Sequence, residues 1–147
     1  MSIMYGYILL VTFVGSVMDI RRKSIPVWYL CVAAVGIIPI AVWKPELPLS
    51  ARLFGGAAGL LFFGIALVSH EAVGKGDAVI IGIVGTALGF SSLCVILCIS
   101  FLILAIFSLG YIVIRRVGRK ARVPFYPFLG AGELLLMLLI SCREVMK

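Results

Sequence analysis

The amino-acid sequence predicts an all-α fold, a polytopic membrane protein built as a bundle of about six transmembrane helices. Hydrophobic residues make up 63% of the chain and charged residues only 13%, whereas soluble domains contain about 45–50% apolar and about 25% charged residues. A spanning helix needs about 20 residues, so a chain of 147 residues has room for about six crossings and for no sizeable soluble domain. We therefore expect residues 1–147 to form a single transmembrane domain.

Apolar segments bounded by charged residues or by proline define the predicted helices. They cover residues 3–19, 27–43, 52–70, 77–90, 92–114 and 127–142. The first segment has no lysine or arginine before it and no small-residue cleavage site after it, so we expect a retained helix rather than a removed signal peptide. The fourth segment is short, and its boundary with the fifth, near residues 90–92, carries no charge. This pattern predicts a tight helical hairpin between the two.

Glycines recur at close helical spacing in the third and fourth predicted helices. Gly55 and Gly59 form a G-x-x-x-G pair in the third, and Gly82, Gly85 and Gly89 follow a similar spacing in the fourth. Small residues at such spacing let helix backbones approach closely in lipid. We expect the third and fourth helices to pack tightly and so to hold the start of the fourth helix in place.

The basic residues predict the orientation of the bundle. Four of them, Lys44, Arg52, Arg143 and Lys147, fall on one side, and nine fall in the first, third and fifth loops: Arg21, Arg22, Lys23, Lys75, Arg115, Arg116, Arg119, Lys120 and Arg122. The positive-inside rule then places those three loops in the cytoplasm and both termini outside. The net charge of +7 is explained by contact with anionic lipid headgroups rather than by nucleic-acid binding.

The chain contains only two aspartates, Asp19 and Asp77, and both lie where an apolar segment meets a short charged turn at the predicted cytoplasmic boundary. Two carboxylates held close together do not both ionise easily, so one keeps a proton while the other stays charged. Such a pair can activate a water for attack on a carbonyl without a metal or a covalent intermediate. Each aspartate also has a structural interpretation. Asp77 could cap the fourth helix, and Asp19 could pair with the basic run at residues 21–23.

Glu133 is the one carboxylate well inside an apolar segment, and such a group normally faces the interior of a bundle. Two interpretations stay open. Glu133 could line the cavity of the aspartate pair, or it could be a protonated acid that is hydrogen-bonded to a neighbouring helix.

Other hydrolytic or metal-dependent sites lack the residues they need. His70 is the only histidine, so the stretch that begins His70-Glu71 cannot complete an H-E-x-x-H zinc site. Ser69 is the direct neighbour of His70, and no G-x-S-x-G turn is present. The four cysteines, Cys31, Cys94, Cys98 and Cys142, form no C-x-x-C pair, and we expect them to pack as small apolar side chains. The sequence predicts no metal and no cofactor.

Three sequence elements resemble the type IV prepilin peptidase family of intramembrane aspartic peptidases. Residues 74–77, Gly-Lys-Gly-Asp, are similar to its G-x-G-D signature. Residues 19–26 resemble a second element, an aspartate followed by a basic run and Ile-Pro, and residues 123–129 resemble its P-F-x-P-F-L element. The resemblance extends over nearly the whole chain with the elements in the family's order.

The resemblance implies an aspartic endopeptidase of the bacterial inner membrane, with Asp19 and Asp77 as the catalytic residues. It implies a prepilin substrate, a transmembrane helix whose short basic leader is removed at the cytoplasmic face. The residues that support the motifs are Pro26, Gly74, Lys75, Gly76, Pro124 and Pro127. The oligomeric state stays open.

The chain also departs from the family pattern. Val79 and Val27 stand where members often have a lysine and an asparagine, and Lys75 offers an alternative positive charge. Longer members carry a cytoplasmic insertion with paired C-x-x-C motifs and an amino-methyltransferase activity. This sequence lacks both the insertion and those cysteines, so it resembles the short, peptidase-only form associated with tight-adherence (Flp-type) pili, and we expect no methylation.

Two functions of other classes remain as alternatives. In a small ion-coupled transporter, Asp19, Asp77 and Glu133 would form a proton or cation path. A non-catalytic platform subunit of a pilus machine would tolerate neutral replacements at both aspartates.

Overall fold

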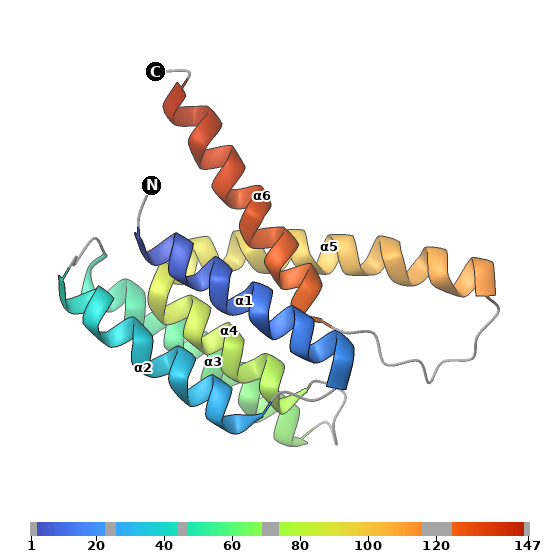
Figure 1. Cartoon of the computed structure of the whole chain (residues 1–147), viewed down its shortest axis with the longest axis horizontal. Helices are drawn as coiled ribbons and strands as arrows, with labels where there is room; N and C mark the ends of the chain where they lie inside the picture. The colour runs from blue at the N-terminus through green and yellow to red at the C-terminus, as the bar shows by residue number, and fades with distance from the viewer. Residues whose placement is uncertain (1–2, 23–25, 44–46, 69–73, 116–124, 146–147) are drawn as a thin grey trace.

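The computed structural model describes residues 3–22, 26–43, 47–68, 74–115 and 125–145, which form six helices joined by short connections (Figure 1). The helices are α1 (Ile3–Arg22), α2 (Val27–Trp43), α3 (Leu49–Val68), α4 (Lys75–Leu88), α5 (Phe90–Arg115) and α6 (Tyr126–Val145). The described segments contain no strand. The prediction of an all-α fold is therefore confirmed.

Among the residues that the structure describes, three helices are long and apolar enough to cross a membrane: Ile3–Arg21 in α1, Leu49–Val68 in α3 and Phe90–Gly110 in α5. Shorter apolar stretches lie in α2, at Val27–Pro39, and in α6, at Tyr126–Cys142. The helix α4 has only 14 residues, well short of the roughly 20 that span a bilayer. These lengths and compositions fit a multi-pass membrane protein.

The boundaries of several helices differ from the predicted ones. The helix α1 continues to Arg22, so Asp19 lies in its last turn and does not end the helix. The helix α3 begins three residues earlier than predicted, at Leu49, and its predicted end at residues 69–70 lies outside the described residues. The helix α4 begins at Lys75, which places Asp77 inside its first turn. Hydrophobic patterning marks where a helix becomes apolar, and the polar turns at the two ends extend beyond that point.

The short helix α4 is central to the bundle. It packs against α1, α2, α3 and α5, and Ile80, Ile81 and Val84 are almost completely buried. Burial begins at Ala78, so the first turn lies at the edge of the bundle, where Lys75 is exposed and Asp77 is half-buried.

The tight packing of α3 against α4 is confirmed. A Cβ atom added to Gly55 would lie 2.0 Å from the carbonyl oxygen of Gly85, and one added to Gly59 would lie 2.2 Å from the Cα atom of Gly82. Neither distance leaves room for a methyl group, so the two backbones touch directly at these glycines.

A single residue, Gly89, separates α4 from α5. Its φ of 82° is a conformation that glycine adopts without steric cost, and its N–H donates to the carbonyl of Gly85 at 2.9 Å. The two helices pack against each other, as the predicted hairpin requires. The turn lies just before the residues at which the sequence predicted it.

The helices α1 and α6 pack together in opposite directions, so the start of α1 and the end of α6 lie toward the same end of the molecule (Figure 1). The first half of α6 also packs on α5. A Cβ atom added to Gly132 would lie 2.8 Å from the carbonyl oxygen of Ile96, and the Phe101 and Phe125 rings are 5.6 Å apart. The remaining halves of α5 and α6 diverge from each other (Figure 1).

Candidate functional site

The carboxylate of Asp19 is held by the beginning of α6. It accepts hydrogen bonds from the backbone N–H groups of Phe125 and Tyr126. The first N–H groups of a helix have no partner within the helix and carry a partial positive charge, so they favour an anionic side chain. The sequence suggested an ion pair with the basic run at residues 21–23, of which residue 23 and the side chain of Arg22 lie outside what the structure describes. The partners that the structure gives Asp19 are backbone groups more than 100 residues later.

The carboxylate of Asp77 lies in the first turn of α4 and accepts a hydrogen bond from the backbone N–H of Gly74. Gly74 is the N-cap residue of α4 and Asp77 is the third helical residue, so the contact is the backward-reaching half of a capping box. The sequence suggested Asp77 as the cap of the fourth helix, whereas the N-cap residue is Gly74 and Asp77 reaches back to it from inside the first turn. A Cβ atom on Gly74 would lie 2.7 Å from Asp77 Oδ2, so glycine gives the carboxylate its space.

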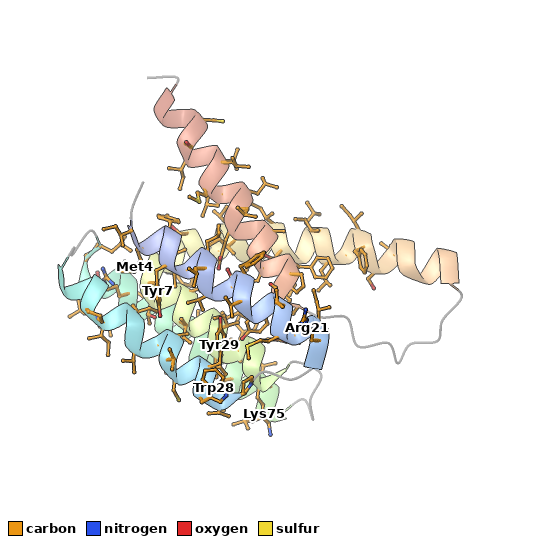
Figure 2. The ribbon with its side chains drawn as sticks, viewed as in Figure 1. Met4, Tyr7, Arg21, Trp28, Tyr29 and Lys75 are labelled. Carbon is orange, nitrogen blue, oxygen red and sulfur yellow. The ribbon has the colours of Figure 1, made fainter. Side chains whose placement is uncertain are left out.

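The carboxyl groups of Asp19 and Asp77 lie close enough for their charges to interact. Burial, and then the charge of Asp19, raise the pKa of Asp77 to about 6, although the Gly74 N–H opposes the change. A neighbouring carboxylate raises the pKa of a carboxyl group, which is the direction expected for two carboxyl groups that share one proton. Arg21 of α1 and Lys75 of α4 are each two residues from one of the aspartates in the sequence. In Figure 2 both lie toward the end of the bundle away from Met4.

Tyr126 connects the elements that carry the two aspartates. Its side chain is fully buried and close enough to feel the charges of both Asp77 and Asp19, while its hydroxyl donates to the carbonyl of Gly76 at 3.4 Å. Its ring packs over Gly15, where an added Cβ atom would lie 2.7 Å from two ring carbons. Sequence reasoning missed this residue because it occupies the variable position of the P-F-x-P-F-L element.

The other residues that support the motifs take varied positions. Pro26 precedes α2, and its carbonyl accepts the N–H of Tyr29 at 3.0 Å. Pro127 is half-buried in the first turn of α6, Gly76 is half-buried in α4, and Lys75 is exposed. Pro124, His70 and Glu71 lie outside the described residues.

Glu133 lies two turns further along α6 than Tyr126 and is almost completely buried, with 3% of its surface exposed. Its Oε2 atom lies 2.6 Å from the hydroxyl oxygen of Thr12 in α1. This contact confirms the hydrogen bond to a neighbouring helix that one of the two interpretations predicted.

The cysteines differ from expectation. All four are free, and each is exposed on the surface of its helix rather than packed in the core. An apolar segment in a membrane protein has faces that point toward lipid, and hydropathy alone does not distinguish these from the faces that pack. Within the described parts of the chain, no group of three or more histidine, cysteine or acidic residues gathers around a possible metal position.

Comparison with known proteins identifies relatives of the chain. A family model described as the type IV leader peptidase family matches residues 6–109, a range that contains both aspartates and ends before the element at residues 123–129. A prepilin leader peptidase/N-methyltransferase of Bacillus subtilis (strain 168) is 34% identical over 104 residues, which cover 70% of this chain and 40% of that protein. A protein of the same description from Aeromonas salmonicida (strain A449) is 32% identical over 97 residues, covering 61% of this chain and 33% of the relative.

The chain thus spans less than half of the length of both relatives. No solved structure gives a significant match.

Proposed function

Because the chain belongs to the type IV leader peptidase family, we propose that it is an intramembrane aspartic endopeptidase that removes the leader from a prepilin. The observation that carries this proposal is the closeness of the two carboxyl groups: burial, and then the charge of Asp19, raise the pKa of Asp77 to about 6. The two relatives are named as prepilin leader peptidases, which supports a prepilin as the substrate. The tight-adherence (Flp-type) class of prepilin is proposed from the sequence resemblance.

The proposed reaction is the addition of water to one peptide bond. The charged carboxylate of the pair takes a proton from a water molecule, and the water oxygen attacks the carbonyl carbon. The protonated carboxyl group donates a hydrogen bond to the carbonyl oxygen and stabilises the negative charge that develops there. The tetrahedral intermediate then collapses, the C–N bond breaks, and the leaving amine receives a proton from the pair.

The two carboxyl groups differ in burial and in hydrogen bonding. Asp19 is the less buried and accepts hydrogen bonds from two backbone N–H groups, of Phe125 and Tyr126, which favours Asp19 as the charged member. Asp77 is more deeply buried and accepts one, from Gly74, and burial and the charge of Asp19 raise its pKa to about 6, which favours it as the proton carrier. The cytoplasmic location of the cleavage is proposed from the basic residues that flank both aspartates.

The test is to express the chain with a candidate Flp-type prepilin and to map the new amino terminus by mass spectrometry. We expect Asp19→Asn and Asp77→Asn each to abolish leader removal. An asparagine oxygen still accepts the hydrogen bonds of Phe125, Tyr126 or Gly74, so both variants should insert and fold. Monodisperse elution in detergent is the control for folding.

Cleavage that persists in either asparagine variant would remove that aspartate from the mechanism. If the wild-type chain supports pilus assembly without cleaving the prepilin, and both asparagine variants do so equally well, a platform subunit explains the data better. Ion flux into proteoliposomes without proteolysis would favour the transporter.

A further inference from the structure

The buried carboxyl group of Glu133 is not used by the proposed reaction. Its side chain is 3% exposed, and Thr12, which it faces, is fully buried. Glu133 Oε2 lies 2.6 Å from Thr12 Oγ1, while Oε1 has no hydrogen-bond partner among the residues that the structure describes. A carboxylate in this setting would hold a negative charge away from water with one oxygen unpaired, which is strongly unfavourable.

The hydroxyl of Thr12 has too few hydrogens for its neighbours. Besides Glu133, its oxygen lies 3.0 Å from the carbonyl oxygen of Ile8 and 3.1 Å from that of Leu9. A hydroxyl has one hydrogen to donate and two lone pairs that accept. If Thr12 donates to a carbonyl of its own helix, as buried threonines do, its oxygen is free to accept a hydrogen bond. A protonated Glu133 supplies that hydrogen.

The contact between Thr12 and Glu133 lies about two helical turns from the residues of the proposed site, in both α1 and α6. Thr12 and Asp19 are seven residues apart in α1, and Tyr126 and Glu133 are seven residues apart in α6. Seven residues are about two helical turns, or roughly 10 Å, so each pair lies on one face of its helix. The seam between α1 and α6 therefore has two polar contacts, Thr12 with Glu133 and Asp19 with the beginning of α6. A slide of α6 along α1 would break both.

We propose that Glu133 is a neutral carboxylic acid that donates a hydrogen bond to Thr12 and thereby sets the register of α6 against α1. In this role it is a positioning residue, because the register determines whether the N–H groups of Phe125 and Tyr126 meet Asp19. The consequence for catalysis rests on the proposed function, but the interhelical hydrogen bond does not.

Disulfide formation between α1 and α6 tests the register directly. A Cβ atom on Gly130 would lie 3.9 Å from Ser16 Oγ, an ordinary contact distance, so Ser16→Cys and Gly130→Cys should cross-link readily. The pair is introduced after replacement of the four native cysteines, all of which are exposed. Failure of the pair to cross-link with Glu133 in place would overturn the proposed register.

Substitutions of Glu133 and Thr12 then show whether position 133 acts as a hydrogen-bond donor or as an ionisable group. Glutamine keeps a donor and an acceptor, so Glu133→Gln should cross-link and cleave prepilin as the parent does. Glu133→Leu and Thr12→Val should each weaken cross-linking by about three- to twenty-fold, the range equivalent to interhelical hydrogen bonds measured in a membrane protein. The variant that combines Thr12→Val with Glu133→Leu should cross-link as well as Glu133→Leu alone. Unchanged cross-linking in Glu133→Leu would overturn the proposal.

Infrared spectroscopy gives a readout that depends on neither cleavage nor cross-linking. The wild-type spectrum minus the Glu133→Gln spectrum at pH 7 should contain the C=O band of a protonated carboxylic acid. A carboxylate band in its place would overturn the proposal. So would a Glu133→Gln variant that cross-links normally but no longer cleaves, because that result assigns Glu133 to proton transfer. If no variant and no wild-type protein cleaves any prepilin, the proposed function fails, while the cross-linking and infrared results still decide the hydrogen bond.

Discussion

Substitution of Gly15 by alanine should misplace the proposed active site without changing any of its functional groups. The new Cβ atom would lie 2.7 Å from two ring carbons of Tyr126, whereas carbon atoms in contact are about 3.5–4.0 Å apart. The Tyr126 ring is fully buried, so it cannot turn outward. The beginning of α6 must therefore move from α1 by about 0.8 Å or more, the difference between these distances.

This displacement acts on both parts of the site, because the Tyr126 N–H donates to Asp19 and its hydroxyl donates to the Gly76 carbonyl. A misplacement of about 1 Å can cost about 100-fold in rate, and an overpacked core loses about 1–3 kcal/mol of stability. We expect losses of this order in Gly15→Ala. The assays are the rate of prepilin cleavage and the thermal midpoint in detergent.

Gly6→Ala is the matched control, because Gly6 lies in the same helix and has no atom within 4 Å of the added Cβ position. A second control is the background Tyr126→Leu, in which the ring is absent. There, Gly15→Ala should cost little more, since substitutions that share one clash are not additive. A Gly15→Ala protein that cleaves and melts like Gly6→Ala would contradict the predicted displacement of α6.

Two further predictions concern the stability of the bundle. In Gly59→Ala, the added Cβ atom would lie 2.2 Å from Gly82 Cα, whereas a Cβ atom at Gly64 of the same helix would meet nothing within 4 Å. Gly59→Ala should therefore lower the thermal midpoint of unfolding, and Gly64→Ala should not. Equal midpoints in the two variants would contradict the α3–α4 contact. Burial and the charge of Asp19 raise the pKa of Asp77 from 3.8 to about 6. Between these two pH values, the folded protein therefore binds more protons than the unfolded chain. The free energy of unfolding should fall as the pH rises from about 4 to about 6 and then level off. The Asp77→Asn variant should show a weaker pH dependence in thermal unfolding at several pH values, and an unchanged slope would exclude Asp77 as its source.

Much of the architecture follows from the sequence because it depends on local patterns. Helix number and approximate position come from hydropathy, since a backbone in lipid must satisfy its own hydrogen bonds. The close contact of α3 with α4 follows from the spacing of Gly55, Gly59, Gly82 and Gly85, because small residues on one helical face permit only a few kinds of packing. The positions of Asp19 and Asp77 near helix ends follow from the same boundaries.

The partners of Asp19 and Glu133 are decided by tertiary structure alone. Asp19 is held by the N–H groups of Phe125 and Tyr126, and Glu133 faces Thr12. These contacts join positions more than 100 residues apart, and no local pattern records which helix will lie opposite a given polar side chain. The burial of Tyr126 and the exposure of the four cysteines have the same origin. Composition and periodicity determine that a segment is an apolar helix, but only packing determines which of its faces meets another helix.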